Sequence, residues 1–403
     1  MKIAKHDLMR STNTLSIIEC IRRCGPIAKK QIQTYTGLSW GAISSISAYL
    51  LDQKVISEFK NTEKLIGRTP SMYEINSSEN LIIGIDINFE GLVAVLIDLK
   101  CSVVKVIHEN INDNQKNKVL DQAKSMLHTL LKSSGVDRRK LIGIGIAMQG
   151  TVDVYKGISV FSPYFADWKD VPIRDIFEKE FGLPVFIEHD PNCMALTERW
   201  LGNATDIKNL LFIRLSMGIG LSIMINGEIY RGTDGSAGEF GHITINPDGA
   251  RCTCGNYGCL EVYSSGRSIV QQAREAIKMG KMTFHQELGE QNVELDLYQV
   301  IELGKTNDAY VMNILDSAAG YLGVGLSILI NIFNPDLIII GGEMAKCYDL
   351  LMERTSKIVR QNSWKSSNVN IAVSKFVNDS AAIGAAAIFI QKIFSGELHY
   401  ITK

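Results

Sequence analysis

Residues 241–261 read GHITINPDGARCTCGNYGCLE and place three of the chain's eight cysteines close to one histidine. His242, Cys252, Cys254 and Cys259 follow the spacing H-x9-C-x-C-x4-C. Three thiolates and one imidazole complete the tetrahedral shell that Zn²⁺ takes in structural sites, with no position left for a catalytic water. The segment therefore predicts one structural zinc ion per chain.

A disulfide and a set of unliganded reduced thiols are the other interpretations of this cluster. The first residues lack the apolar stretch of a signal peptide, and apolar runs such as 337–340 are far shorter than the roughly 18 residues of a membrane span. We expect a cytoplasmic protein without membrane contact, whose thiols stay reduced, and this disfavours a disulfide. The other cysteines are scattered, and we expect them to be packed apolar residues: Cys20, Cys24, Cys101, Cys193 and Cys347.

Length and composition indicate a globular protein of two or three domains. The chain has 403 residues, 46% hydrophobic and 21% charged, which excludes disordered and fibrous classes. Its net charge of −1 hides an asymmetry, because residues 1–75 carry eleven Lys/Arg and only six Asp/Glu. A basic segment attached to an acidic body suggests a module that binds a polyanion.

Apolar residues at helical spacing predict three short helices in the basic segment. The first ends at Gly25-Pro26, the second covers residues 28–36, and the third covers residues 40–51. The stretch TGLS, residues 36–39, makes a tight turn between the last two. This order of elements is that of a helix-turn-helix.

Alternating residues at 55–59 and 71–75 predict two strands joined by a basic loop, so that residues 1–76 form a winged helix-turn-helix domain. A helical protein-interaction domain is the alternative. Small hydroxyl side chains on the third helix and cations in the loop are suited to DNA grooves and phosphates. The predicted DNA contacts are Ser39, Trp40, Ser44, Ser45, Ser47, Lys64 and Arg68.

The remaining residues predict two related α/β lobes with a cleft between them. LIIGIDI, LVAVLIDL and SVVKVI, beginning at residues 81, 92 and 102, indicate three strands, followed by a helix near 118–133 and a strand at 141–148. A similar series begins near residue 209. We expect a first lobe of residues 77–190 with the C-terminal helix 381–403, and a second lobe of residues 191–380 that carries the zinc loop and an oligomerisation surface.

Four motifs resemble the ROK family of sugar-responsive repressors and sugar kinases: GIDI at 84–87, EHDPNCMALTE at 188–198, GEFGH at 238–242 and CTCGNYGCLE at 252–261. The resemblance covers the whole chain and is to the repressor branch, which includes xylose and N-acetylglucosamine repressors. It implies an actin-like (ribonuclease H-like) two-lobed sugar-kinase fold after a winged helix-turn-helix, with the four zinc ligands named above.

The resemblance also implies a sugar site made of carboxylates, an amide and an imidazole, whose atoms bond well to sugar hydroxyls. One nitrogen of His242 would bind zinc and the other would meet the sugar. The residues carried over are Asp190, Asn192, Glu239, His242 and Glu261. In the kinases of the family, the position of Asp190 is that of the catalytic base.

Two departures from the kinase pattern predict that phosphoryl transfer is lost. The first phosphate turn of the kinases reads D-x-G-G-T, whereas residues 86–90 here read DINFE, without either glycine and with a carboxylate at the phosphate position. The second turn, residues 216–220, keeps its glycines but has Met217 in place of a hydroxyl residue. We expect a sugar site with a vestigial base and no enzyme activity; an ATP-dependent sugar kinase with an appended DNA-binding domain is the alternative.

A further departure lies at residues 162–168, SPYFADW, where the kinases have Pro-Asn-Leu. Phe165 or Trp168 can stack on a sugar face or pack into the lobe. Together the patterns predict a sugar-responsive regulator, most simply a repressor, that binds operator DNA and a sugar or sugar phosphate. We expect a homodimer or a tetramer; a protein whose N-terminal domain docks another protein is a third class.

Overall fold

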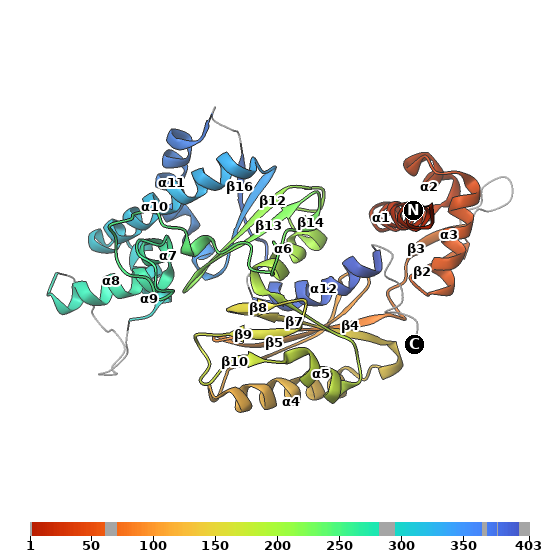
Figure 1. The fold of residues 1–403 in the computed structure, drawn as a ribbon, viewed down its shortest axis with the longest axis horizontal. Coiled ribbons are helices and arrows are strands. Elements are labelled where there is room, and N and C mark those ends of the chain that lie inside the picture. Colours follow the sequence, from red (N-terminus) through yellow and green to blue (C-terminus); the bar gives the residue numbers. More distant parts are fainter. Residues whose placement is uncertain (1, 61–70, 282–294, 365–368, 377, 395–403) are drawn as a thin grey trace. The chain divides into compact units, whose positions relative to one another are not determined.

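The computed structural model describes residues 2–60, 71–281, 295–364, 369–376 and 378–394. The chain divides into two compact units, one of residues 1–196 and 379–403 and the other of residues 197–378 (Figure 1). The lobe boundary expected after residue 190 lies at the start of helix α6 (Asp190–Leu201), whereas the units divide inside this helix, after Leu196.

The first unit begins with the predicted winged helix-turn-helix, here called the head. Gly37, with φ of 68°, makes the turn, and the Ser39 hydroxyl caps the third helix by accepting from the N–H of Ala42 at 3.3 Å. A short extra strand completes an antiparallel sheet of order β1-β3-β2. Lys64 and Arg68 lie outside the described residues. The elements are α1 (Lys2–Cys24), β1 (Ile27–Ala28), α2 (Lys29–Thr36), α3 (Trp40–Asp52), β2 (Ile56–Lys60) and β3 (Ser71–Ile75).

The linker from the head to the first lobe is short and bonded to the head. The backbone N–H of Asn76 donates to the Val55 carbonyl at 2.9 Å, and the Asn80 side-chain amide donates to the Lys54 carbonyl at 3.0 Å. Glu79 adds an ion pair with Lys54 at 3.1 Å. Strand β4 (Leu81–Asn88) begins directly after these contacts, so the linker contains no long unbonded segment.

The first lobe is built on a five-stranded sheet of order β11-β7-β4-β5-β6. Its strands are β4 (Leu81–Asn88), β5 (Gly91–Asp98), β6 (Val103–Glu109), β7 (Leu141–Met148) and β11 (Val185–His189). Strands β4, β7 and β11 are parallel, and Ile87, Met148 and His189 lie in register at their carboxyl ends. The turns after β4 and β7 and the start of α6 therefore share one edge of the sheet, where open α/β sheets meet their ligands.

Helices cover both faces of this sheet, α4 (Lys116–Ser134) and α5 (Ile173–Phe181) on one and α12 (Ser380–Phe394) on the other (Figure 1). Helix α12 approaches the strands so closely that a Cβ at Gly145 would lie 1.9 Å from the carbonyl oxygen of Ala385. Only glycine allows this packing. The smaller elements are the 3₁₀ turn η1 (Arg138–Lys140) and the antiparallel strands β8 (Thr151–Asp153), β9 (Ile158–Phe161) and β10 (Lys169–Val171).

The second unit repeats the strand order of the first lobe, as the duplicated sequence pattern predicted. Its sheet, β14-β13-β12-β15-β16, also joins an antiparallel meander to two parallel strands. The strands are β12 (Leu210–Leu215), β13 (Ile219–Ile225), β14 (Glu228–Ile229), β15 (Leu337–Gly341) and β16 (Asn370–Val373). The helices are α7 (Glu261–Ser264), α8 (Gly266–Lys278), α9 (Leu297–Lys305), α10 (Ala309–Phe333) and α11 (Tyr348–Asn362), with 3₁₀ turns η2 (Phe240–His242) and η3 (Glu343–Cys347).

Helix α10 is long and apolar enough to cross a membrane by length and composition. However, 61% of its most apolar window is buried inside the protein, and its side chains form much of the core of the second unit. This environment is that of a core helix.

Candidate metal and sugar sites

The cysteine loop folds back on itself through short backbone hydrogen bonds. The N–H of Gly258 donates to Ala250 at 2.8 Å, and the N–H of Cys252 donates to Asn256 at 2.7 Å. Gly258 has φ of 65°, and a Cβ there would lie 1.5 Å from the Asn246 carbonyl oxygen. A side chain at this position would collide with the backbone, so the loop requires glycine here.

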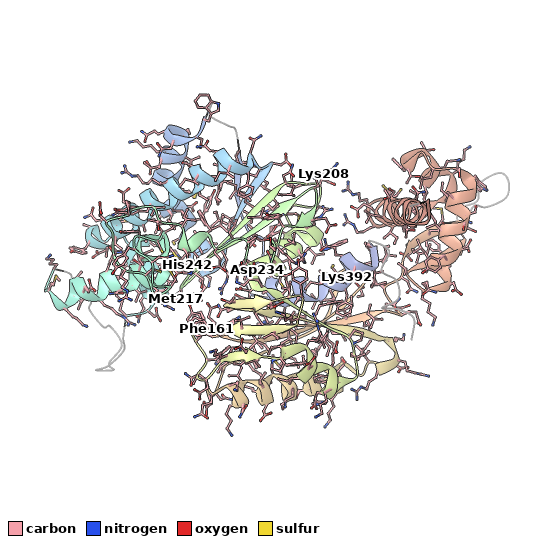
Figure 2. All side chains as sticks on the ribbon, viewed as in Figure 1. Phe161, Lys208, Met217, Asp234, His242 and Lys392 are labelled. Carbon is pink, nitrogen blue, oxygen red and sulfur yellow. The ribbon has the colours of Figure 1, made fainter. Side chains whose placement is uncertain are left out.

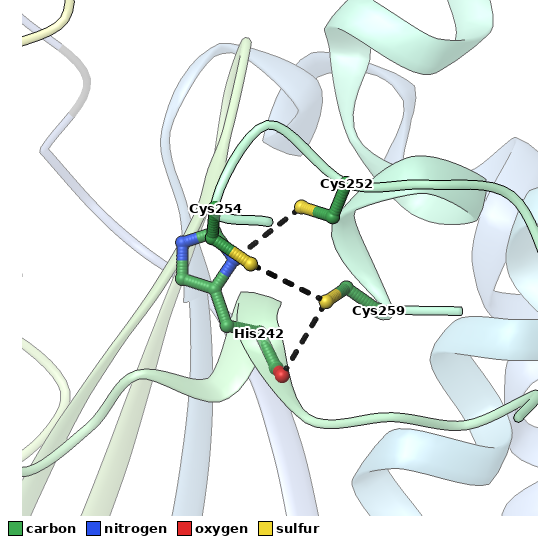
Figure 3. Close-up of side chains that lie close together, drawn as sticks. All are labelled: His242, Cys252, Cys254 and Cys259. Carbon is green, nitrogen blue, oxygen red and sulfur yellow. Dashed lines mark hydrogen bonds between the residues drawn. The ribbon is translucent and has the colours of Figure 1, made fainter. Parts of the chain in front are cut away.

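The loop brings His242, Cys252, Cys254 and Cys259 together around one point (Figure 3). Their ligand atoms all lie within 4.8 Å of one another. The Cys252 sulfur is 3.7 Å from Nδ1 of His242, and the sulfurs of Cys254 and Cys259 are also 3.7 Å apart. Sulfurs bound tetrahedrally at 2.3 Å from zinc are about 3.8 Å apart. The cluster thus has the donor set and the spacing of a metal site, and Nδ1 is the histidine atom that faces the thiols.

Three of the expected sugar residues lie next to this cluster in the second unit. Nε2 of His242 is 4.0 Å from the Glu239 carboxylate, on the nitrogen not directed at the thiols. Glu261 lies beside the segment that carries these two residues. Its Oε2 atom would be 3.4 Å from a Cβ placed on Gly241, which stands between Glu239 and His242 in the chain. Glu239 is exposed and His242 is partly exposed, so polar atoms at this place can meet a ligand.

Asp190 and Asn192 belong to the first unit, at the beginning of α6 and at the carboxyl edge of the sheet. Both are buried, at 3% exposure each. The Asn192 amide donates to the buried Glu188 carboxylate at 2.9 Å, and the Nε2 atom of His189 lies 3.5 Å from Asp190. Glu188 is a supporting residue that sequence reasoning missed, although it stands in the same EHDPN motif.

Residues 86–90 correspond to the first phosphate turn of the kinases, and backbone N–H groups at the end of this turn are hydrogen-bonded to side chains of this protein. The Asn88 side-chain oxygen accepts the backbone N–H groups of Glu90 at 2.8 Å and Gly91 at 3.2 Å. The N–H of Phe89 donates to the Gln149 side-chain oxygen at 3.3 Å. Backbone N–H groups are the donors with which such turns hold phosphate. Here these three are bonded within the protein.

The second turn is bonded to the protein's own carboxylates. The Ser216 hydroxyl lies 3.4 Å from Glu343, and the N–H of Ile219 donates to Glu261 at 3.2 Å. Met217, labelled in Figure 2, occupies the position of the usual hydroxyl residue. Glu343, which follows the buried strand β15, is a second residue that the sequence pattern did not identify.

The two aromatic residues predicted either to stack on a sugar or to pack into the lobe are both buried. Phe165 is 5% exposed and Trp168 2% exposed, their rings pack at 4.8 Å, and the Trp168 indole donates to Ser159 at 2.8 Å. They are core residues, which was the other interpretation. Tyr164, by contrast, is partly exposed and stacks on Phe89.

The structure of the head shows that one of the predicted DNA contacts is wrong. Ser47 lies on the inward face of α3 and is fully buried, so DNA cannot reach it. Ser39, Trp40, Ser44 and Ser45 are exposed or partly exposed on the same helix. Another aromatic residue, Tyr35, is 68% exposed on the surface of α2, although its helical spacing from the buried Ile32 would predict that it faces inward.

The comparisons with known proteins agree with this architecture. Residues 82–392 match the ROK family. The chain belongs to the ROK family. A putative xylose repressor of Caldicellulosiruptor sp. (strain Rt8B.4) is 30% identical over 397 residues, 98% of this chain and 99% of that protein.

Solved structures separate the head from the body. The ROK family transcriptional regulator that is a homologue of the E. coli MLC protein superposes with a TM-score of 0.85 at 25% identity, over 98% of this chain and 99% of that chain. The ROK family glucokinase from Streptomyces griseus, in complex with glucose and AMPPNP, gives 0.66 at 26% identity over 77% of this chain and 99% of its own. The regulator thus matches nearly the full length, and the kinase a part of it.

Proposed function

We propose that this ROK family protein is a sugar-responsive transcriptional repressor that binds operator DNA through residues 1–76 as a homodimer. The observation that carries the proposal is the joining of a winged helix-turn-helix to a ROK body whose first phosphate turn is filled by Asn88 and Gln149. The full-length similarity to a regulator and to a putative xylose repressor supports it.

Operator binding is assigned to the exposed face of α3 and the wing. Ser44 and Ser45 lie on this face together with Trp40 and the capping residue Ser39. Small hydroxyls let the helix backbone approach a major groove and bond to phosphates or base edges. A dimer would place two such helices on successive half-sites.

The sugar is assigned to Asp190, Asn192, Glu239, His242 and Glu261. These residues are divided between the two units, so a sugar that contacts both sets would favour one arrangement of the units over others. Differential affinity of this kind is what is needed to change operator binding. No chemistry on the sugar is required.

A structural zinc ion is assigned to the cluster of His242 and the three cysteines, whose donor set and spacing fit it. The ion would fix the His242 ring through Nδ1 and leave Nε2 to the sugar. It would also hold the loop that carries Glu261 at its end.

The sugar kinase is the second candidate, because a ROK glucokinase shares the body. The bonded N–H groups of the first turn and the carboxylate of Glu90 oppose binding of nucleotide phosphates. Purified protein incubated with MgATP and a panel of aldoses should produce no ADP above the background without sugar. Sustained sugar-dependent ADP production would overturn the non-enzymatic part of the proposal.

DNA binding is tested with Ser45→Glu and the matched variant Thr129→Glu, which adds the same charge to an exposed position of α4. Operator fragments are first selected from random duplexes and then titrated in a gel-shift assay. Ser45→Glu should weaken binding by at least about tenfold, since one close base or phosphate contact is worth about 1–3 kcal/mol. Thr129→Glu should bind like the original protein. Equal binding by both variants, or absence of any selected duplex, would contradict the assignment.

A further inference from the structure

Phe89 and Tyr164 form a stacked aromatic pair at the ligand edge of the first lobe. Their ring centroids are 4.5 Å apart and their planes 19° apart. Phe89 lies in the turn after β4, and Tyr164 lies in the loop between β9 and β10. Both rings are partly exposed, unlike the neighbouring core residue Phe165. The outer faces of such a pair are suited to contact with another molecule.

The pair stands on a fixed part of the backbone. The Phe89 N–H is held by Gln149, and the next two N–H groups are held by Asn88. Ile87, just before this turn, lies in the register row that passes through Met148 to His189. The aromatic pair is therefore on the same sheet edge as Asp190, which follows His189.

The chemistry at this edge is apolar and acidic. A sugar ring presents C–H groups on its faces and hydroxyls on its rim, which fit aromatic rings and carboxylates respectively. A phosphate ester would meet backbone donors that are already bonded, at a sheet edge that also carries Glu90, next to Phe89 in the turn, and Asp190, which follows β11. The ester has the same sign of charge as these carboxylates, which opposes its binding.

We propose that Phe89 and Tyr164 form the apolar wall of the effector site, and that this site takes a free sugar and rejects the phosphate ester of the same sugar. The inference rests on the proposed function, because it deepens the sugar site of the repressor. It adds Phe89 and Tyr164 to the five residues carried over from the family, and both stand in segments that depart from the kinase motifs. The bonded N–H groups and the carboxylates at this edge account for rejection of the ester.

The experiment is calorimetric titration of the full chain with a panel of pentoses, hexoses and N-acetylhexosamines, each paired with its phosphate ester. At least one free sugar should bind, and its ester should bind at least about tenfold more weakly. Tyr164→Ala should weaken binding of the free sugar by about tenfold, the upper range for an aromatic contact. Tyr164→Phe should stay within about twofold of the original protein, because stacking needs the ring and not the hydroxyl.

Tyr155→Ala is the matched control, since Tyr155 is 61% exposed in the turn between β8 and β9, at the far end of that hairpin. It should bind sugar normally. Tighter binding of an ester than of its free sugar, or equal affinities of Tyr164→Ala and Tyr164→Phe, would overturn the inference. Absence of binding by every compound would also overturn it. Operator titration of the same sample then shows whether the DNA-binding part of the proposed function has failed as well.

Discussion

Replacing Glu198 with alanine should destabilise the second unit by about 4 kcal/mol. The side chain is fully buried, yet its carboxylate accepts three hydrogen bonds. The Asn203 N–H lies at 2.7 Å, the Ser374 hydroxyl at 2.7 Å and the Lys375 N–H at 2.9 Å. These contacts tie the end of α6 to the segment after β16, near both places where the chain passes between the units.

The magnitude follows from the number and kind of these bonds. A hydrogen bond to a charged group contributes about 1.5–3 kcal/mol, and bonds that share one acceptor do not add fully. Three of them therefore give about 4 kcal/mol, which lowers Tm by about 8–16 °C in a unit of this size. Glu198→Gln should lose about half as much, because its NH₂ group must face at least one of the N–H donors.

Urea unfolding followed by circular dichroism, with a thermal scan as the second measurement, checks this. Glu302→Gln is the matched control, since Glu302 is 44% exposed and pairs with Lys305 on the surface. That change removes the same charge and should alter stability by less than about 0.5 kcal/mol. If both Glu198 variants unfold at the same urea concentration as the control, the carboxylate does not hold these segments together and the reasoning is refuted.

Two further changes test the metal cluster and the head. Cys254→Ser should reduce bound zinc from about one equivalent per chain to near none, as measured by elemental analysis. It should also lower Tm, because the ion would bind only the folded loop. An unchanged zinc content would contradict the ligand set. Burial opposes ionisation of Glu19, but hydrogen bonds and charges from Arg22 and Arg23 outweigh it and lower its pKa to about 2. The ion pairs therefore stabilise the folded head above a pH of about 4.5, and this contribution is lost as pH falls towards 2. Glu19→Gln should lower the free energy of unfolding by up to about 3 kcal/mol at neutral pH, and by progressively less in acid, in denaturation curves. A cost that stays constant over this range would exclude the ion pairs as its source.

The long periodic elements could be predicted from the sequence because each is fixed by local pattern. The three head helices, the strands β4 to β7 and the duplicated strand order all follow from apolar spacing and turn residues. The clustering of His242 with the three cysteines could also be predicted from the sequence, since a short loop allows few ways to arrange four donors. These features depend on residues close together in the chain.

Features that depend on contacts between residues far apart in the chain could not be predicted from the sequence. Ser47 has the small hydroxyl of a DNA contact, but the rotation of α3 buries it. Phe165 and Tyr164 are adjacent aromatic residues, and only tertiary packing decides that the first enters the core while the second stacks on Phe89. The bond between Phe89 and Gln149 joins residues sixty positions apart.

The bonded linker between head and lobe has a consequence for the choice of operator. Asn76 and Asn80 stand at the two ends of this linker and are both bonded to the head, so little unbonded chain is left between the head and β4. If such subunits form a dimer, the short linkers limit how far the distance between the two recognition helices can change. Inserting base pairs at the centre of a palindromic site should therefore be tolerated poorly, and a full helical turn should not restore what a few extra base pairs remove.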